Sequence, residues 1–183
     1  MIDLTPKFLE LQRFKPPTVG RYKISELWGV LNAYDTPEQF IKGKIIDFES
    51  AMKMKMGTLK HKLCQECLEG WEIEKKTEFT ITTLAGEDFL IVGMADAIKD
   101  DTIMEIKTSD TLIEKAKRWH EWQLKMYLGM FNQKYGIIVQ PIIKKGLFLK
   151  TIGEVKENKD WFNKEINKII ELHKNLCQMR KKN

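Results

Sequence analysis

Three strand-like segments follow one another in the middle of the chain and constrain what the rest of it can fold into. EIEKKTEFTITTL, which starts at Glu72, alternates in polarity, and EDFLIVGMADAI and TIMEIKTS follow it. All three are rich in β-branched or aromatic residues, a composition that favours strands. GIIVQPII and GLFLKTI have the same character further along. The sequence therefore predicts a sheet in the middle of the chain.

Segments with helical periodicity surround these strands. Short helices are expected in KISELWGVLNAY and in TPEQFIKG, where Thr36 can cap the helix and Pro37 takes its first position. Longer helices are expected in IIDFESAMKMKMGTLKHKLCQECLEG, in TLIEKAKRWHEWQLKMYLGMFNQKYG and in the tail VKENKDWFNKEINKIIELHKNLCQMRKKN. The first of these three has an apolar stripe at Phe48, Met52, Met56, Leu59, Leu63 and Cys67. The predicted order is helices, three strands, helix, two strands, helix.

The size of the chain fits one domain. Its 183 residues and mass of 21.5 kDa allow a sizeable core. Residues 1–21 contain three prolines and a glycine and are expected to form an N-terminal lead-in, with a single domain over residues 22–183. No apolar run approaches the roughly 20 residues of a membrane span, so we expect no membrane partner and a cytoplasmic protein.

The charge balance is mildly basic. The formal net charge is +5 and the sequence pI is about 9.0. From Lys107 to Lys150 the chain contains nine lysines and arginines but only three acidic residues. This excess hints at a polyanionic partner, and a solvated lysine-rich surface is the alternative.

Charged residues interrupt two of the predicted strands. Because side chains alternate along a strand, Glu105 and Lys107 share one face. If Asp100 and Asp101 form a two-residue hairpin turn, paired positions sum to 201, and Asp96 then lies opposite Glu105. The sequence thus places two carboxylates and a lysine together.

Two facing carboxylates whose side chains start about 5 Å apart repel each other unless a cation lies between them. Oxygen ligands suit Mg²⁺ or Mn²⁺, and such sites keep positions open for water and phosphate. Beside the metal, Lys107 could polarise an attacking water or neutralise charge on a phosphoryl group. The alternative is an exposed strand face carrying a surface salt bridge.

Four short motifs occur in order around these residues. Gly57 and His61 are one helical turn apart, as are Gln123 and Tyr127. With Gly93-x-x-Asp96 and Glu105-x-Lys107 between them, the set reads G-x-x-x-H, G-x-x-D, E-x-K and Q-x-x-x-Y. This ordered set, covering roughly residues 57–127, resembles the RecB-like branch of the PD-(D/E)XK nuclease superfamily.

The resemblance implies a fold and a metal site. The fold would be α/β, a central mixed β-sheet flanked by helices. His61, Asp96 and Glu105 would bind the metal, with Asp96 as the bridging carboxylate. The backbone carbonyl of Ile106 would also reach the metal, and Lys107 would be the catalytic lysine.

The resemblance also implies an activity. We expect a Mn²⁺- or Mg²⁺-dependent DNA nuclease, an exonuclease on single-stranded or frayed ends that leaves 5′ phosphates. A structure-selective endonuclease remains open. Gln123 and Tyr127 would contact the DNA or support the site. The rival interpretation is a non-catalytic nucleic-acid-binding or assembly module with the same fold, and a protein partner or homo-oligomer is compatible with either.

The cysteines depart from the branch. Its CRISPR-associated members hold an iron-sulfur cluster on four cysteines, whereas this chain has Cys64, Cys67 and Cys177. We therefore expect no such cluster, and small buried side chains instead. His173 has no partner that the sequence identifies. Trp119 and Trp122 flank His120 and could stack on single-stranded bases, with core packing as the alternative for at least one of them.

Overall fold

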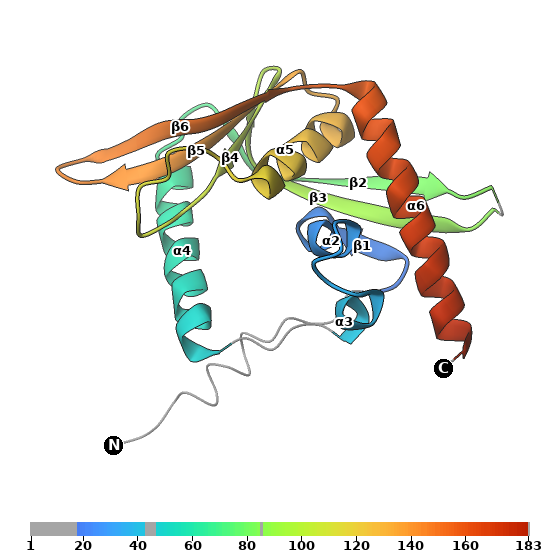
Figure 1. Cartoon of the computed structure of the whole chain (residues 1–183). Helices are drawn as coiled ribbons and strands as arrows, with labels where there is room; N and C mark the ends of the chain where they lie inside the picture. The colour runs from blue at the N-terminus through green and yellow to red at the C-terminus, as the bar shows by residue number, and fades with distance from the viewer. Residues whose placement is uncertain (1–17, 43–46, 85, 183) are drawn as a thin grey trace.

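The computed structural model describes residues 18–42, 47–84 and 86–182 (Figure 1). Residues 1–17 of the predicted lead-in lie outside the described residues. The elements are β1 (Arg21–Lys23), α2 (Ile24–Leu31), α3 (Pro37–Lys42), α4 (Phe48–Glu66), β2 (Glu72–Thr82), β3 (Asp88–Lys99), β4 (Thr102–Ile106), α5 (Arg118–Phe131), β5 (Tyr135–Ile143), β6 (Leu147–Lys156) and α6 (Lys159–Lys182). The predicted order is confirmed, and β1 is an additional short strand.

The strands form one mixed sheet of six strands. β3 pairs antiparallel with β2 along most of its length, and its other edge pairs with β1 at one end and β4 at the other. β4 and β5 run parallel, joined by a crossover through α5, and β6 returns antiparallel to β5. The predicted α/β class with a mixed sheet is therefore confirmed.

The two faces of the sheet bury different clusters. The main core joins β3 to α2, α5 and α6, while a smaller cluster joins the sheet to the end of α4 at Cys64. β4 contributes to both, because Ile103 lies in the main core and Met104 and Ile106 lie in the smaller cluster. β4 is thus a central strand buried on both faces.

The helix expected from Thr111 begins later, at Arg118. The preceding segment is irregular because side chains from neighbouring strands satisfy its backbone. Buried Gln140 accepts a hydrogen bond from the Ile113 amide at 2.7 Å and donates one to the Thr111 carbonyl at 2.7 Å. Lys150 donates to the Ile113 carbonyl at 3.1 Å. These bonds replace those that a longer helix would make.

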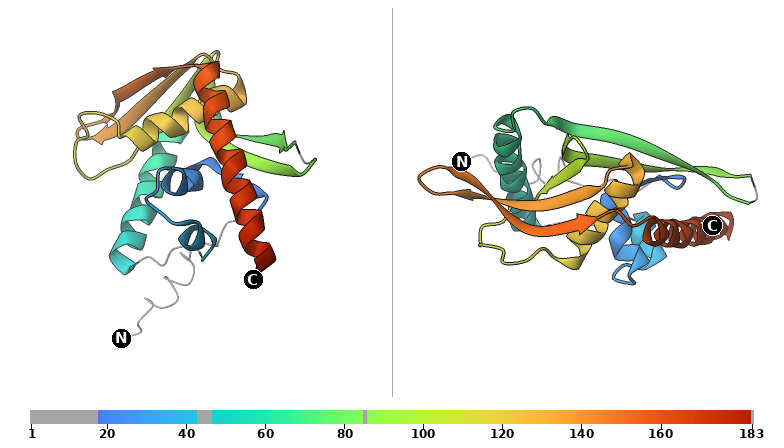
Figure 2. Two further views of the ribbon diagram at one scale, coloured as in Figure 1. Left: turned by 45° about the vertical axis from the view of Figure 1, so that its right-hand side comes forward. Right: turned by 90° about the horizontal axis from the view of Figure 1, so that it is seen from above.

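The apolar stripe that predicted α4 does not face the core. Figures 1 and 2 show the N-terminal half of α4 standing beyond the strands. The helix instead directs Gly57, His61 and Gln65, each one turn apart, toward β3 and the end of β4. The stripe lies on the opposite side, with exposed fractions of 38–53% at Phe48, Met52, Met56, Leu59 and Leu63. Among the described helices, none is long and apolar enough to cross a bilayer.

Candidate active site

The hairpin between β3 and β4 sets the register of the candidate site. Asp100 and Asp101 form the turn, with Asp100 at a φ of +49°. The observed pairs are Lys99 with Thr102, Ile98 with Ile103 and Ala97 with Met104. Each pair sums to 201, so the predicted register is confirmed as far as Ala97.

The ladder ends before Asp96 and Glu105, so these two residues do not form the direct cross-strand pair that the register predicts. The side chains of β3 change face at this point. Ala95 lies in the main core, whereas Ala97, two residues later, lies in the smaller cluster on the other face of the sheet. The side chain of Asp96 replaces the ladder bond, because its Oδ2 accepts a hydrogen bond from the Ile106 amide at 2.7 Å. Asp96 is thereby fixed against the backbone of β4.

α4 brings His61 to Asp96. The Nε2 atom of His61 lies 3.3 Å from Oδ1 of Asp96. Burial disfavours the charged imidazolium, but the hydrogen bond and the charge of Asp96 outweigh it and raise the pKa of His61. Gln65 supports the same strand by donating to the Asp96 carbonyl at 3.1 Å. Adjacent ligands of an octahedral cation are separated by roughly 3 Å, so the His61 and Asp96 atoms are spaced to share one.

Gly57 allows this approach of α4. A Cβ atom at Gly57 would lie 2.8 Å from Oγ1 of Thr108, which follows Lys107 directly. A larger residue would therefore require either the Thr108 side chain or the helix to shift. The glycine of the first motif thus has a steric role.

Glu105 is the most enclosed carboxylate of the group, with 1% of its surface exposed. Its Oε2 lies 2.8 Å from Nζ of Lys107, while its Oε1 is buried without a hydrogen-bond partner. Burial is the main cause that raises the pKa of Glu105 to about 7; Lys107 opposes the shift and the charge of Asp96 adds to it. A buried acceptor without a partner is costly, and a bound cation would satisfy it.

α5 holds Lys107 from the other side. Nζ of Lys107 donates to Oε1 of Gln123 at 3.0 Å, and Nε2 of Gln123 donates to the Tyr127 hydroxyl at 2.9 Å. Burial raises the pKa of Tyr127, which keeps the phenol protonated. Gly93 fits closely under this helix, since a Cβ there would lie 3.1 Å from Cε1 of Tyr127.

These contacts join all the predicted side chains into one continuous group from α4, β3, the end of β4 and α5. The ligand atoms of His61, Asp96 and Glu105 are not, however, gathered within 4.8 Å of one another. The ion pair of Glu105 with Lys107 and the hydrogen bond of Asp96 to Ile106 hold these carboxylates. The residues nevertheless fit a hard divalent cation, because Oε1 of Glu105 has no other partner.

The two tryptophans that flank His120 lie in different environments. Trp122 is buried and donates to Oε2 of Glu165 at 2.9 Å, whereas Trp119 is 38% exposed and its ring centroid lies 5.3 Å from Nζ of Lys107. His120 packs on Trp119, and burial, reinforced by Lys107 and Lys117, lowers its pKa to about 4.

The cysteines lie in different surroundings. Cys64 is buried in the smaller cluster, as expected. The expectation of a buried side chain is wrong for Cys67, which is exposed at the end of α4. His173, which lacked a partner in the sequence, lies beside Tyr22, Glu87 and Cys177. The spacing of His173 and Cys177 by one helical turn was the available signal for this second group.

The sequence matches no protein-family model and no curated protein. Solved structures resemble it over nearly its whole length. The protein SSO0001 is 22% identical with a TM-score of 0.59, covering 96% of this chain and 84% of its own. The alkaline exonuclease LHK-Exo from Laribacter hongkongensis is 13% identical with a TM-score of 0.59, covering 97% of both chains.

Two further structures agree with this likeness. LHK-Exo in complex with dAMP is 14% identical with a TM-score of 0.59, covering 97% of both chains. A phage related exonuclease from Haemophilus somnus 129PT is 13% identical with a TM-score of 0.53, covering 94% of this chain and 98% of its own. At such identities the likeness concerns the fold, which confirms the prediction from the sequence: this chain has the fold of the PD-(D/E)XK nuclease superfamily.

Proposed function

We propose that this chain is a divalent-metal-dependent deoxyribonuclease, acting as an exonuclease on single-stranded or frayed DNA ends. The observation that carries the proposal is the unsatisfied carboxylate of Glu105. Its Oε1 is buried and has no hydrogen-bond partner, although Lys107 binds its Oε2 and Asp96 lies nearby. The exonuclease neighbours of the fold support a nuclease. LHK-Exo has been solved in complex with dAMP, a deoxynucleoside monophosphate, which supports a DNA substrate.

Asp96, Glu105, the Ile106 carbonyl and His61 would hold the Mn²⁺ or Mg²⁺ ion. Such an ion supplies charge stabilisation at the phosphate and lowers the pKa of the attacking water. An imidazole ligand favours Mn²⁺ over Mg²⁺.

In this proposal Lys107 acts on the substrate. Its Nζ has hydrogen-bond partners on two sides, Glu105 and Gln123, which fix its direction. From there it can donate to a phosphate oxygen or to the water that attacks phosphorus in line. Gln123 and Tyr127 are positioning residues, because they orient Lys107 from α5. The products would carry 5′ phosphate and 3′ hydroxyl ends.

Cleavage of labelled DNA tests the proposal. The parent is incubated with end-labelled single-stranded DNA and Mn²⁺, beside Lys107→Ala and Asp96→Asn. Asparagine keeps an oxygen that can accept from the Ile106 amide, so Asp96→Asn is expected to fold. Lys174→Ala, which changes an exposed lysine paired with Glu171 on α6, is the matched control.

The expected result is metal-dependent cleavage by the parent and by Lys174→Ala, with a loss of at least 100-fold in the two site variants, the order of general acid–base and electrostatic contributions. Resistance of a closed circular single strand would identify an exonuclease. Binding of DNA without cleavage by the parent would instead support the non-catalytic module, and equal cleavage by all variants would remove these residues from the site.

A further inference from the structure

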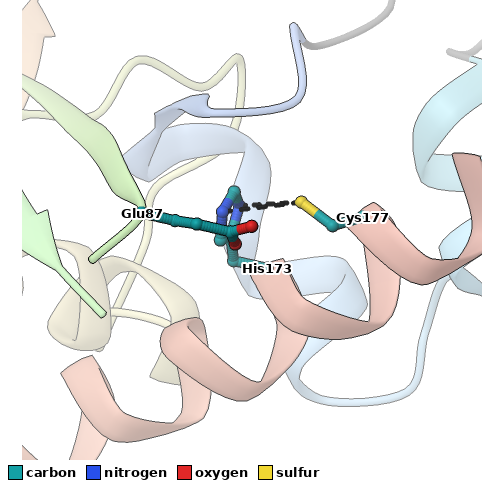
Figure 3. Close-up of side chains that lie close together, drawn as sticks. All are labelled: Glu87, His173 and Cys177. Atoms are coloured by element: carbon teal, nitrogen blue, oxygen red, sulfur yellow. Dashed lines mark hydrogen bonds between the residues drawn. The ribbon is translucent and has the colours of Figure 1, made fainter. Parts of the chain in front are cut away.

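A second group of metal-ligating side chains lies away from the candidate active site. Glu87, just before β3, and His173 and Cys177, both on α6, have ligand atoms within 4.8 Å of one another (Figure 3). Among the described residues this is the group of three or more His, Cys, Asp or Glu side chains that meets this spacing. It combines a carboxylate, an imidazole and a thiol from two distant parts of the sequence.

The spacing of the thiol and imidazole suits a tetrahedral metal. The Sγ atom of Cys177 lies 3.6 Å from Nε2 of His173. With Zn–S at about 2.3 Å and Zn–N at about 2.1 Å, the S···N edge of a tetrahedron is about 3.6 Å. The two atoms therefore already have the separation of neighbouring zinc ligands.

The imidazole of His173 is held in an orientation that suits a ligand. The side chain is buried, its Nδ1 lies 2.8 Å from the Tyr22 hydroxyl, and its ring stacks on Phe89 with 4.4 Å between centroids. When Nδ1 carries the hydrogen and donates to Tyr22, Nε2 keeps its lone pair for an ion. Such a partner on the second nitrogen is usual for metal-binding histidines. Sγ of Cys177 lies 3.6 Å from Nε2 and 3.9 Å from Nδ1, beside the ring, so the Cys177 side chain has to rotate to share that ion.

The group is also accessible from the solvent. Glu87 is exposed and Cys177 is partly exposed, so an ion can reach the group. The fourth position would be filled by water.

We propose that Glu87, His173 and Cys177 form a Zn²⁺ site that clamps α6 to the start of β3. The ligand set of nitrogen, sulfur and oxygen is typical of zinc. An iron-sulfur cluster normally takes four thiolates, whereas Cys177 is the cysteine of this group, with Cys64 and Cys67 at the end of α4. The site uses none of the residues assigned to the nuclease, so it stands or fails independently.

Cobalt substitution tests the site. Full-length protein, freed of metal under reducing conditions, is titrated with Co²⁺ and then with Zn²⁺. One equivalent of Co²⁺ is expected to give a thiolate-to-cobalt charge-transfer band, which Zn²⁺ abolishes by displacement. Cys177→Ser is expected to lose the band, and Glu87→Gln and Tyr22→Phe to weaken binding by about 10- to 100-fold.

Two control variants separate this site from others. Cys67→Ser changes an exposed cysteine, and His61→Ala changes the candidate active site; both are expected to keep the band. A parent without the band, or a band that survives in Cys177→Ser, would overturn the proposal.

Thermal unfolding gives a readout that needs no thiolate spectrum. At Zn²⁺ concentrations 100 times the Kd, ligand linkage predicts a rise in Tm of about 5–10 °C for a chain of this size. Glu87→Gln, a change at an exposed residue, is expected to fold and to lose about half of this rise or more. An equal rise in the parent and in Glu87→Gln would remove Glu87 from the site.

Discussion

Glu105 and Lys107 form an ion pair with 2.8 Å between Oε2 and Nζ, in which the carboxylate is buried and the ammonium is held by a second acceptor on Gln123. Burying a charged pair costs desolvation energy that the pair recovers only when its remaining atoms are satisfied. Oε1 of Glu105 is not satisfied. A buried carboxylate with an unsatisfied oxygen favours its protonated form, which agrees with the raised pKa of Glu105.

The metal-free protein is expected to lose stability as the pH rises from about 4.5 to 7. Burial chiefly raises the pKa of folded Glu105 from 4.5 to about 7. Between these values the folded state binds more protons than the unfolded state, so raising the pH removes stability, by about 3 kcal/mol over the full shift. Urea unfolding in the presence of chelator, at pH 5 and pH 7.5, measures this change. Glu105→Gln cannot titrate and should show a smaller pH dependence; the same dependence in both proteins would contradict the assignment.

His61→Ala is expected to weaken Mn²⁺ binding by at least about tenfold and Mg²⁺ binding by less. The imidazole lies 3.3 Å from Asp96, and nitrogen ligands favour Mn²⁺ more than they favour Mg²⁺. Calorimetric titration of both ions measures the difference. Lys62→Ala, on the exposed side of the same helix, is the control. Unchanged Mn²⁺ binding in His61→Ala would remove the histidine from the site.

The placement of Glu105 beside Lys107 in the candidate site could be predicted because it depends on local spacing. Strand alternation places Glu105 and Lys107 on one face, and the Asp100–Asp101 turn fixes the hairpin register from residues that are neighbours in sequence. The change of face along β3 at Asp96 could not be predicted in this way. It depends on a side chain replacing a ladder bond to Ile106, a choice that neither strand sequence reveals.

Long-range contacts account for the other differences. Two opposite faces of α4 carry residues at helical spacing. The apolar face is the stronger pattern in the sequence, yet the face with Gly57 and His61 is the one that contacts the strands. Similarly, α5 starts late because Gln140 and Lys150, which come after it in the sequence, bind the preceding backbone. Such competition between local and tertiary hydrogen bonds is invisible in a single periodic segment.

Gly57→Ala is expected to reduce metal-dependent cleavage by about 10- to 100-fold, the order produced by small displacements of catalytic groups. Alanine is the better helix former by about 1 kcal/mol, so the helix itself should not suffer. The added Cβ would lie 2.8 Å from Oγ1 of Thr108 and push His61 away from Asp96. The double variant Gly57→Ala with Thr108→Ala removes that oxygen and should recover activity. Failure of this rescue, with Thr108→Ala alone active, would show that the clash is not the cause.

Trp119 and Trp122 are expected to respond in opposite ways to removal of the ring. Trp119 is 38% exposed and lies 5.3 Å from Nζ of Lys107, so a base can stack on it beside the site. Trp119→Ala should weaken binding of single-stranded DNA by about 1–3 kcal/mol with little change in Tm, while Trp119→Phe, which keeps a ring, should bind more like the parent. Trp122 is buried and hydrogen-bonded to Glu165, so Trp122→Ala should instead cost about 3–5 kcal/mol of folding stability.

Fluorescence anisotropy with a labelled oligonucleotide, in an Asp96→Asn background that prevents cleavage, measures the binding of single-stranded DNA by the Trp119 variants. If Trp119→Ala and Trp119→Phe lose the same amount of DNA affinity, stacking on the ring is not the cause, because phenylalanine still offers an aromatic face and alanine does not.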